Sequence, residues 1–143
     1  MKNKSIILLF LLILDLNFFS SASSDEFSFN ISELQISEDG RIIKGVNGGI
    51  VTSKNNEIII TANNFKYNKL TTLLEAEGNV ELVDNIEGIK IKSNKIFYLK
   101  NKEKISTLGK TNINIQKEYN FEGYDLTLLK NEMVLSSSEK ATI

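Results

Sequence analysis

The sequence predicts an all-β fold, a jelly roll or folded-over sheet of bent antiparallel strands built from four repeats of about 31 residues. Three observations predict it: apolar and polar residues alternate at period two, this pattern recurs along the chain, and each repeat shifts parity once at its middle. No segment after residue 24 carries an apolar stripe of helical spacing, which argues against a helical domain.

The first 24 residues are predicted to be a signal peptide. The two lysines of Met1–Lys4 precede the apolar run Ser5–Phe19, and small residues follow it. This run is too short for the roughly 30 Å hydrocarbon core of a bilayer and contains Asp15, which disfavours a membrane anchor. We therefore expect cleavage near Ala22 or Ser24 and export to the periplasm.

Residues 25–143 are predicted to form one domain, and the first half of each repeat places apolar or small residues at five positions. The four copies are Phe27, Phe29, Ile31, Leu34 and Ile36; Ile58, Ile60, Ala62, Phe65 and Tyr67; Ile89, Ile91, Ser93, Ile96 and Tyr98; and Tyr119, Phe121, Gly123, Leu126 and Leu128. The period-two spacing predicts a strand with one buried face. The skip of two residues after the third position predicts a β-bulge that bends the strand and keeps the same face inward.

The second half of each repeat is a further strand with a glycine at its middle. The two clear copies are Leu74, Ala76, Gly78, Val80 and Leu82, and Ile105, Thr107, Gly109, Thr111 and Ile113. An earlier copy around Val46, Gly48 and Ile50 requires a shift of one residue, and the last copy, from Leu135 to Ile143, is incomplete. Gly78 and Gly109 are predicted to bend their strands, and the polar segments 53–57, 84–88 and 100–104 are predicted hairpin turns.

A single repeat cannot bury its apolar face, but stacked repeats share a core. Because every strand bends, we expect the sheet to fold over so that its inward faces meet across a narrow apolar interior. Ala62, Ser93 and Gly123 are small where the bend is predicted, which lets facing strands approach. The predicted inward residues are Ile60, Phe65, Tyr67, Leu74, Val80, Leu82, Ile91, Ile96, Tyr98, Ile113, Phe121 and Leu126; from the residues alone they are an ordinary core.

Composition excludes several classes of function. The 143 residues include no histidine and no cysteine, which excludes disulfides, a lipoprotein anchor, and zinc sites or nucleophilic triads built on those residues. The charge is close to neutral without a basic block, which disfavours nucleic acid as a partner. Glu75, Glu77 and Glu81 have the parity opposite to the apolar residues and are expected to face water. We predict no catalytic residue, no metal and no cofactor.

The string "AEGNVELVD" (76–84) followed by "IKIKSNKIFYLKNKEK" (89–104) resembles the repeat of the organic-solvent-tolerance-like (OstA-like) domains of lipopolysaccharide transport, as does "ITANNFKY" (60–67). The other copies depart from the pattern, with "GGIV" or "GKTNI" in place of "GNV". The resemblance implies a β-jelly roll with open ends that binds the lipid A acyl chains of lipopolysaccharide and passes them along an apolar groove, with the twelve inward residues as the lipid-contacting surface. It implies transport and not catalysis.

An independent physical argument agrees with that implication. Each buried CH₂ group is worth about 0.8 kcal/mol, so a chain of about 12 carbons in water costs on the order of 10 kcal/mol. A carrier therefore needs an apolar interior and a polar exterior, which the alternation supplies. The slot must stay unsealed because the sugar head group cannot enter it, and its open strand edges invite addition of strands from other Lpt-type β-jelly-roll proteins.

Two placements in the transport system follow from the resemblance, and one alternative does not involve lipid. The chain is most similar to the N-terminal periplasmic domain of the outer-membrane translocon, LptD, whose partners would be an outer-membrane barrel and its lipoprotein if the chain continues. The alternative placement is a stand-alone, LptA-like bridge protein of the periplasm. The alternative outside transport is a structural β-scaffold with a closed interior and no ligand.

Overall fold

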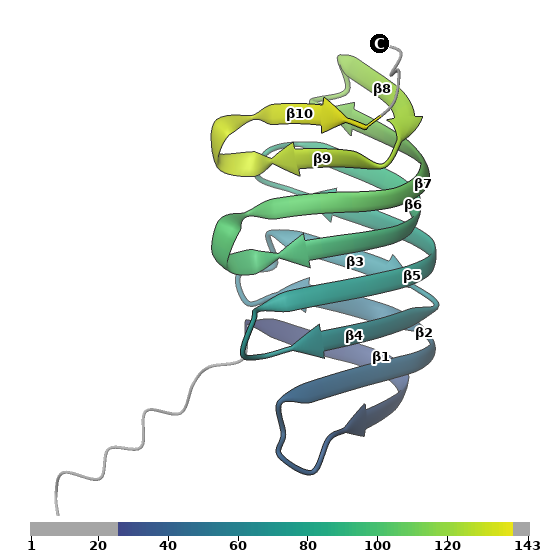
Figure 1. Cartoon of the computed structure of the whole chain (residues 1–143), viewed down its shortest axis with the longest axis vertical. Coiled ribbons are helices and arrows are strands. Elements are labelled where there is room, and N and C mark those ends of the chain that lie inside the picture. Colours follow the sequence, from purple (N-terminus) through teal and green to yellow (C-terminus); the bar gives the residue numbers. More distant parts are fainter. Residues whose placement is uncertain (1–25, 139–143) are drawn as a thin grey trace, which may run out of the picture.

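In the computed structural model, residues 26–138 are described, and they form one antiparallel sheet of ten strands that folds over on itself (Figure 1). The predicted signal peptide, residues 1–24, lies outside the described residues. The strands are β1 (Phe27–Ile36), β2 (Ile42–Ser53), β3 (Ile58–Ala62), β4 (Asn64–Asn68), β5 (Leu73–Asp84), β6 (Ile89–Leu99), β7 (Lys104–Ile115), β8 (Tyr119–Tyr124), β9 (Leu126–Leu129) and β10 (Val134–Ser137). Two short 3₁₀ turns, η2 (Lys100–Lys102) and η3 (Lys130–Glu132), connect β6 to β7 and β9 to β10. The all-β prediction is confirmed.

The strands follow one another along the sheet in nearly sequential order. The path is β1-β2-β3-β5-β6-β7-β9-β10, with β4 between β2 and β5 and with β8 beside β7. Strands β3 and β4 are the two halves of one bent strand that is interrupted at Asn63, and β8 and β9 are likewise separated by Asp125. The turns 54–57, 85–88 and 100–103 match the predicted hairpin turns to within one residue.

Every long strand is interrupted along one line, which is the predicted bend. Pairing shifts register between Ile31 and Glu33 in β1, and between Ser93 and Lys95 in β6. Gly78 and Gly109 lie at the same line with φ of 82° and 87°, a conformation that glycine adopts without steric cost. The register shifts lie where the bulges were predicted, and both glycines stand at the bend with positive φ.

One predicted register is wrong. In β2 the residues paired with the inward faces of β3 and β4 are Ile43, Gly45, Gly49 and Val51. These positions lie 31 residues before Leu74, Ala76, Val80 and Leu82, so the repeat needs no one-residue shift. Ile50, which the shifted alignment placed inward, is 40% exposed on the outer face.

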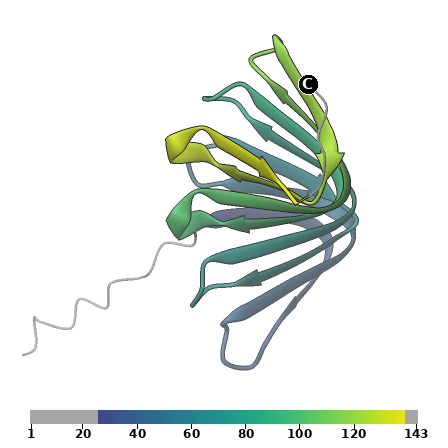
Figure 2. The same ribbon diagram turned by 45° about the horizontal axis from the view of Figure 1, so that its top comes forward.

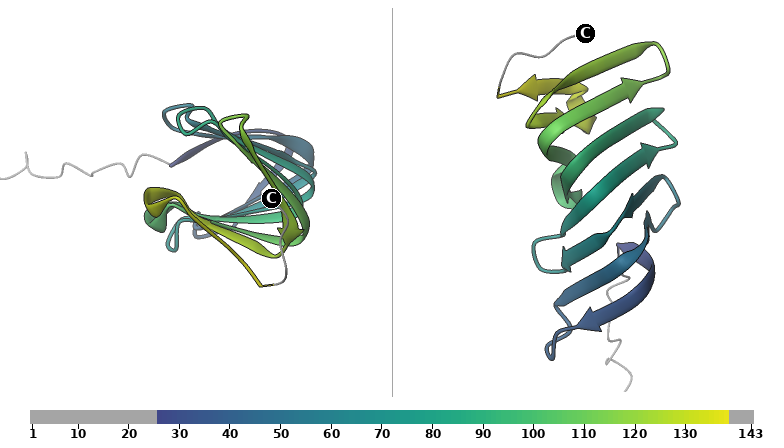
Figure 3. Two further views of the ribbon diagram at one scale, coloured as in Figure 1. Left: turned by 90° about the horizontal axis from the view of Figure 1, so that it is seen from above. Right: turned by 90° about the vertical axis from the view of Figure 1, so that its right-hand side faces the viewer.

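The bend divides the sheet into two layers that meet along the bend line and part toward the turns (Figures 2 and 3). Layer A contains residues 27–31, 49–53, 58–62, 80–84, 89–93, 111–115 and 119–124, and layer B contains 33–36, 42–46, 64–68, 73–77, 95–99, 104–108, 126–129 and 134–137. We call the turn side, opposite the bend, the mouth. The core lies between the layers. None of residues 26–138 belongs to a helix long and apolar enough to cross a membrane.

The two glycines give a matched test of the bend. Alanine at either position places a Cβ in the left-handed region, which costs about 1–3 kcal/mol. At Gly78 the new Cβ also meets Asn63 Nδ2 at 2.7 Å and Asn63 Cβ at 3.0 Å, whereas nothing lies within 4 Å at Gly109. We expect Gly78→Ala to lower the free energy of unfolding by about 1 kcal/mol more than Gly109→Ala, as measured by urea unfolding followed by circular dichroism. Equal losses would contradict the close approach of Asn63 to the bend.

Candidate functional site

The candidate site is the apolar interior between the layers. All twelve residues predicted to point inward lie on the inner face, and eleven of them are 4% exposed or less. Phe121 is half-buried at the β8 end of the interior, packed against the core cluster. The repeat pattern therefore locates the inner face correctly at all twelve of these positions.

The interior is filled by its own side chains. At the mouth, Phe27 of layer A packs edge-on against Tyr67 of layer B with ring centroids 5.1 Å apart, and its ring lies 6.0 Å from that of Tyr98. Near the bend, Ile60, Leu82 and Ile91 are 1% exposed or less. The sequence suggested an unsealed slot, but in this structure the space between the layers is occupied by the residues expected to line it. A ligand chain therefore has to displace these side chains or separate the layers.

The apolar inner face reaches solvent at both ends of the stack. At the β1 end, Leu34 and Ile36 keep the inward parity and are 39% and 62% exposed. At the other end, Tyr119 keeps the inward parity and is 54% exposed, and Leu135 of β10 is half-buried against the core. The inner surface is thus continuous along the stack and accessible at its two ends.

A group of buried hydroxyls interrupts the apolar surface near the bend. Ser93 Oγ lies 2.9 Å from Thr111 Oγ1, which lies 2.8 Å from Thr107 Oγ1. Thr107 Oγ1 accepts a hydrogen bond from the backbone N–H of Leu126 at 3.0 Å and donates to its carbonyl oxygen at 3.3 Å. These hydroxyls supply partners for backbone groups beside the break between β8 and β9, which accounts for polar residues in the core.

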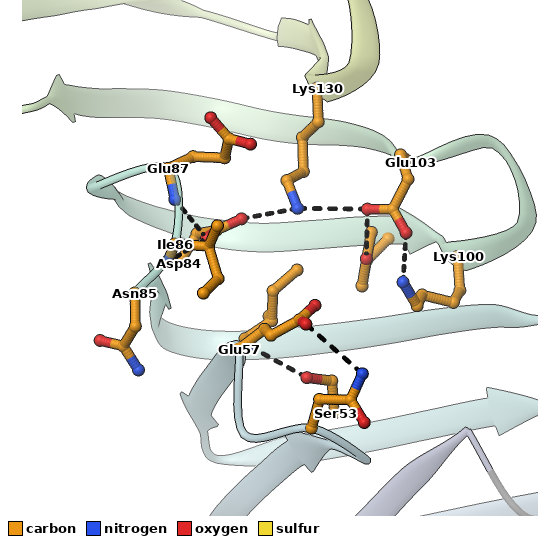
Figure 4. A network of polar contacts seen from close by, with 12 residues as sticks. Ser53, Glu57, Asp84, Asn85, Ile86, Glu87, Lys100, Glu103 and Lys130 are labelled. Carbon is orange, nitrogen blue, oxygen red and sulfur yellow. Dashed lines mark hydrogen bonds and ion pairs between the residues drawn. The ribbon is translucent and has the colours of Figure 1, made fainter.

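An ion network lies at the mouth, between the two layers (Figure 4). Lys130 Nζ is 2.6 Å from Asp84 Oδ2 of layer A and 3.2 Å from Glu103 Oε2 of layer B. Asp84 Oδ1 accepts the backbone N–H groups of Ile86 and Glu87, each at 2.9 Å. The side chains of Asp84, Lys130 and Glu103 are only 1%, 11% and 20% exposed.

Glu103 is held from layer B by two further donors. The buried hydroxyl of Tyr98 donates to Glu103 Oε2 at 2.7 Å, and Lys100 pairs with Glu103 Oε1. Beside the network, a cavity of about 490 Å³ is lined partly by Glu57, Glu87 and Asn131. The mouth therefore combines buried ion pairs with a cavity next to them.

The network shifts the pKa values of its members. Burial opposes ionisation of Asp84, but the backbone N–H of Glu87 and the ammonium of Lys130 outweigh it and hold the pKa of Asp84 below its ordinary value. Burial likewise opposes the charge of Glu103, yet Lys100, Tyr98 and Lys130 lower its pKa. The pKa of Lys130 is raised because its two carboxylates outweigh burial, and burial together with Glu103 raises the pKa of Tyr98. All three ions are therefore charged at neutral pH.

The sequence analysis did not identify these ions as part of the site. One signal was present: Asp84 continues the inward parity of Val80 and Leu82, and is therefore a charged residue on an apolar face. Nothing in the local pattern around Lys130 marks it as the partner, since the two residues lie in different repeats and are brought together only by the folding of the sheet.

The three glutamates that were predicted to face water lie on the outer face of the sheet. Glu75 and Glu77 pair with Lys95 on the outer face, and Glu81 pairs with Lys90 and Lys92. Across residues 26–138 no group of three or more acidic side chains is arranged to hold a metal ion. These pairs belong to the polar exterior of the sheet.

Comparison with known proteins gives a similarity of fold. No family model matches the chain, and no curated protein matches it in sequence. Among solved structures, the fold is similar to the crystal structure of LptH from Pseudomonas aeruginosa, described as the LptA-homologous periplasmic component of the conserved lipopolysaccharide transport device. The TM-score is 0.70 at 10% sequence identity, over 80% of this chain and 82% of that chain. The chain therefore has an LptA-like β-jelly-roll fold.

Loss of the cation at the mouth tests the ion network. Lys130→Met leaves Asp84 buried without its ammonium partner, and we expect the free energy of unfolding at neutral pH to fall by about 3–5 kcal/mol. Urea unfolding followed by circular dichroism measures this change. A loss within the range of an exposed ion pair, under about 1 kcal/mol, would contradict the buried arrangement.

The lowered and raised pKa values predict how stability depends on pH. Since the pKa values of Asp84 and Glu103 are lowered on folding, the unfolded chain binds more protons in acid, and stability falls as the pH drops through and below about 4. Since the pKa of Lys130 is raised above 10.5, its contribution persists at neutral pH and is lost only at higher pH. Asp84→Asn should make the acid branch shallower in urea unfolding at stepped pH. An unchanged acid branch would exclude Asp84 as a contributor.

Proposed function

We propose that this protein binds the acyl chains of lipopolysaccharide between its two layers and passes them along the stack in the periplasm. The observation that carries the proposal is the inner face itself, which presents apolar side chains in every repeat, extends from β1 to β10, and is accessible at both ends. The twelve inward residues are the proposed lipid-contacting surface. The exterior is polar, so the same sheet keeps an acyl chain dry and stays compatible with water.

Two further observations support the proposal. The fold is shared with a protein described as a periplasmic component of lipopolysaccharide transport. The strings "AEGNV" and "TANNFKY" independently resemble the repeat of OstA-like domains in sequence. The fold and the sequence motifs thus favour the same class of cargo.

Filling of the interior by side chains is compatible with this function. Acyl chains are close in polarity and flexibility to the aliphatic side chains that occupy the space, so replacing one contact by the other changes the buried apolar area little. Rings such as Phe27 and Tyr67 meet at the mouth by contact alone and separate without breaking a hydrogen bond between them. A chain that inserts between the layers therefore exchanges apolar contacts for apolar contacts.

Partners are proposed from the strand edges. Within residues 26–138, β1 pairs only with β2 and β8 pairs only with β7, so each end of the stack presents a strand with one free edge. Such edges accept strands from another β-jelly roll, and a stack lengthened this way would continue the apolar inner face. The proposed protein partners are other Lpt-type β-jelly-roll proteins.

The placement within the transport system has two candidates. The first is the N-terminal periplasmic domain of the outer-membrane translocon, whose partners would be a barrel and its lipoprotein. The alternative is a stand-alone bridge protein, and the similarity of fold to the Pseudomonas protein is compatible with both candidates. Affinity purification of the native protein from its own cells distinguishes the two: a barrel covalently continuous with this domain supports the translocon, and a free domain of this size supports the bridge.

Photo-crosslinking from the inner face tests lipid binding. A diazirine amino acid at Phe65 or Ile96 is expected to form adducts with lipopolysaccharide, because both side chains are buried between the layers. The same group at Lys66, the exposed outer-face neighbour of Phe65, or at Lys92, an exposed outer-face residue of the same strand as Ile96, is the control and is expected to form few adducts. Adducts are measured by immunoblot for lipopolysaccharide after irradiation.

The alternative hypothesis, a structural β-scaffold without a ligand, predicts the opposite result. A closed interior without a ligand gives no adducts at any inward position, and equal labelling of inner and outer positions indicates nonspecific adsorption. Either result would reject the proposed function.

A further inference from the structure

The two layers are joined at the mouth by one buried ion pair whose partners come from opposite sides of the interior. Asp84 ends β5 in layer A, and Lys130 begins η3, which follows β9 in layer B; their charged atoms are 2.6 Å apart (Figure 4). Asp84 is 1% exposed and Lys130 is 11% exposed, so the pair lies within the closed mouth and not on its rim.

Each partner is fixed from its own layer. The turn after β5 holds Asp84 Oδ1 with the N–H groups of Ile86 and Glu87, which leaves Oδ2 to face Lys130. Layer B holds Glu103 through the Tyr98 hydroxyl, and Glu103 in turn positions the ammonium. The two halves of the contact are thus preorganised separately, and only the Lys130–Asp84 contact crosses between the layers within this network.

The arrangement is specific to one level of the stack. The segments "LKNKE" (99–103) and "LKNEM" (129–133) repeat, and Lys100 pairs with Glu103 inside its own turn. In the last repeat Met133 stands where Glu103 stands in the preceding one, and Lys130 reaches back to Glu103 and across to Asp84. One repeat before Asp84 the equivalent position is Ser53, which is also buried but carries no charge.

We propose that Asp84, Lys130 and Glu103 form a latch that holds the two layers closed over the apolar interior, and that opening of this latch controls how readily an acyl chain is admitted. The uptake part of this proposal rests on the proposed function. A buried ion pair suits a reversible closure, because the attraction of the two charges is largely offset by the hydration that they regain on separation. The cavity of about 490 Å³ beside the latch is lined by all three ions and supplies that hydration.

The latch differs in kind from the rest of the mouth. An inserting acyl chain can replace the apolar contacts of Phe27 with Tyr67 and Tyr98, but it offers nothing to a separated carboxylate and ammonium. The ionic contact therefore resists an acyl chain that the aromatic contacts would admit. Glu57 and Glu87 also face the cavity, so an opened latch leaves a mouth with excess negative charge, which favours reclosure on Lys130.

Distances between spin labels test the latch without any lipid. The chain has no cysteine, so labels at Ile86→Cys in layer A and Asn131→Cys in layer B react only there. We expect a single short distance by pulsed electron paramagnetic resonance, and a broader distribution extending to longer distances when Asp84→Asn is added. Lys130→Gln tests the same contact from layer B. Glu81→Gln removes the two ion pairs with Lys90 and Lys92 on the outer face of layer A and is expected to leave the label distance unchanged.

Uptake of a probe tests the functional consequence. The rate at which a dodecyl-chain fluorophore becomes protected from water is expected to rise on the order of tenfold in Asp84→Asn and Lys130→Gln. The double variant Asp84→Leu/Lys130→Met replaces the ions by apolar side chains that have no hydration to regain, and should keep the short label distance. Because an acyl chain can replace apolar contacts, this variant should nevertheless take up the probe faster than the unmodified protein.

The outcomes separate the two proposals. An unchanged label distance in both Asp84→Asn and Lys130→Gln overturns the latch, as does opening of the double variant to the same extent. A probe that inserts equally fast in all variants also overturns the latch but leaves lipid binding intact. Longer label distances in the single variants, with no probe uptake in any protein, support the latch as a structural device and reject the proposed function.

Discussion

The fold depends on one constraint: each strand has to bend at its middle and still direct the same side chains to the interior. Two kinds of strand satisfy it: β6 shifts parity at the bend, whereas β5 and β7 keep strict period two through a glycine with positive φ. The chain meets this constraint with alternate devices on neighbouring strands. Asn63 and Asp125 interrupt their strands, while Gly78 and Gly109 bend theirs with positive φ. The devices are hydrogen-bonded in pairs, since Asn63 N–H donates to the Gly78 carbonyl oxygen and Gly109 N–H to Asp125 Oδ1.

Because every strand bends at the same line, the two halves of a single sheet pack against each other. The two layers need no second sheet or helix to cover their apolar faces, and the same hydrogen-bonded ladder runs through both. Because the layers are joined covalently and by pairing only at the bend, the mouth is held by side chains alone. The contacts between the layers include those of Phe27 and Phe29 with the tyrosines of layer B and the ion pair of Lys130 with Asp84.

The sequence predicted the inner face far better than it predicted the state of the interior. Alternation reports which side of a strand a residue occupies, and repetition places the bends, so all twelve inward residues were found from pattern alone. Alternation says nothing of the distance between the layers, which is why an open slot was expected and a filled one was found. The register of β2 was misjudged because two of its inward positions, Gly45 and Gly49, carry no apolar side chain. The residues that follow them, Val46 and Ile50, are apolar and were therefore taken as the inward positions.

The ion pair at the mouth was missed for a different reason, and that reason bears on how function is found in repeat proteins. Features shared by all repeats, such as the bends and the inward aliphatic residues, are required to build the stack and therefore follow from its architecture. A feature present in a single repeat is not required by the architecture, because the neighbouring repeats fold without it. Asp84 stands at the position where the preceding repeat has the uncharged Ser53. Met133 stands at the position where the preceding repeat has Glu103. Some residues depart from the repeat, are buried and charged, and contact each other across the interior. Such residues are the most informative about functions of this protein other than maintaining its fold.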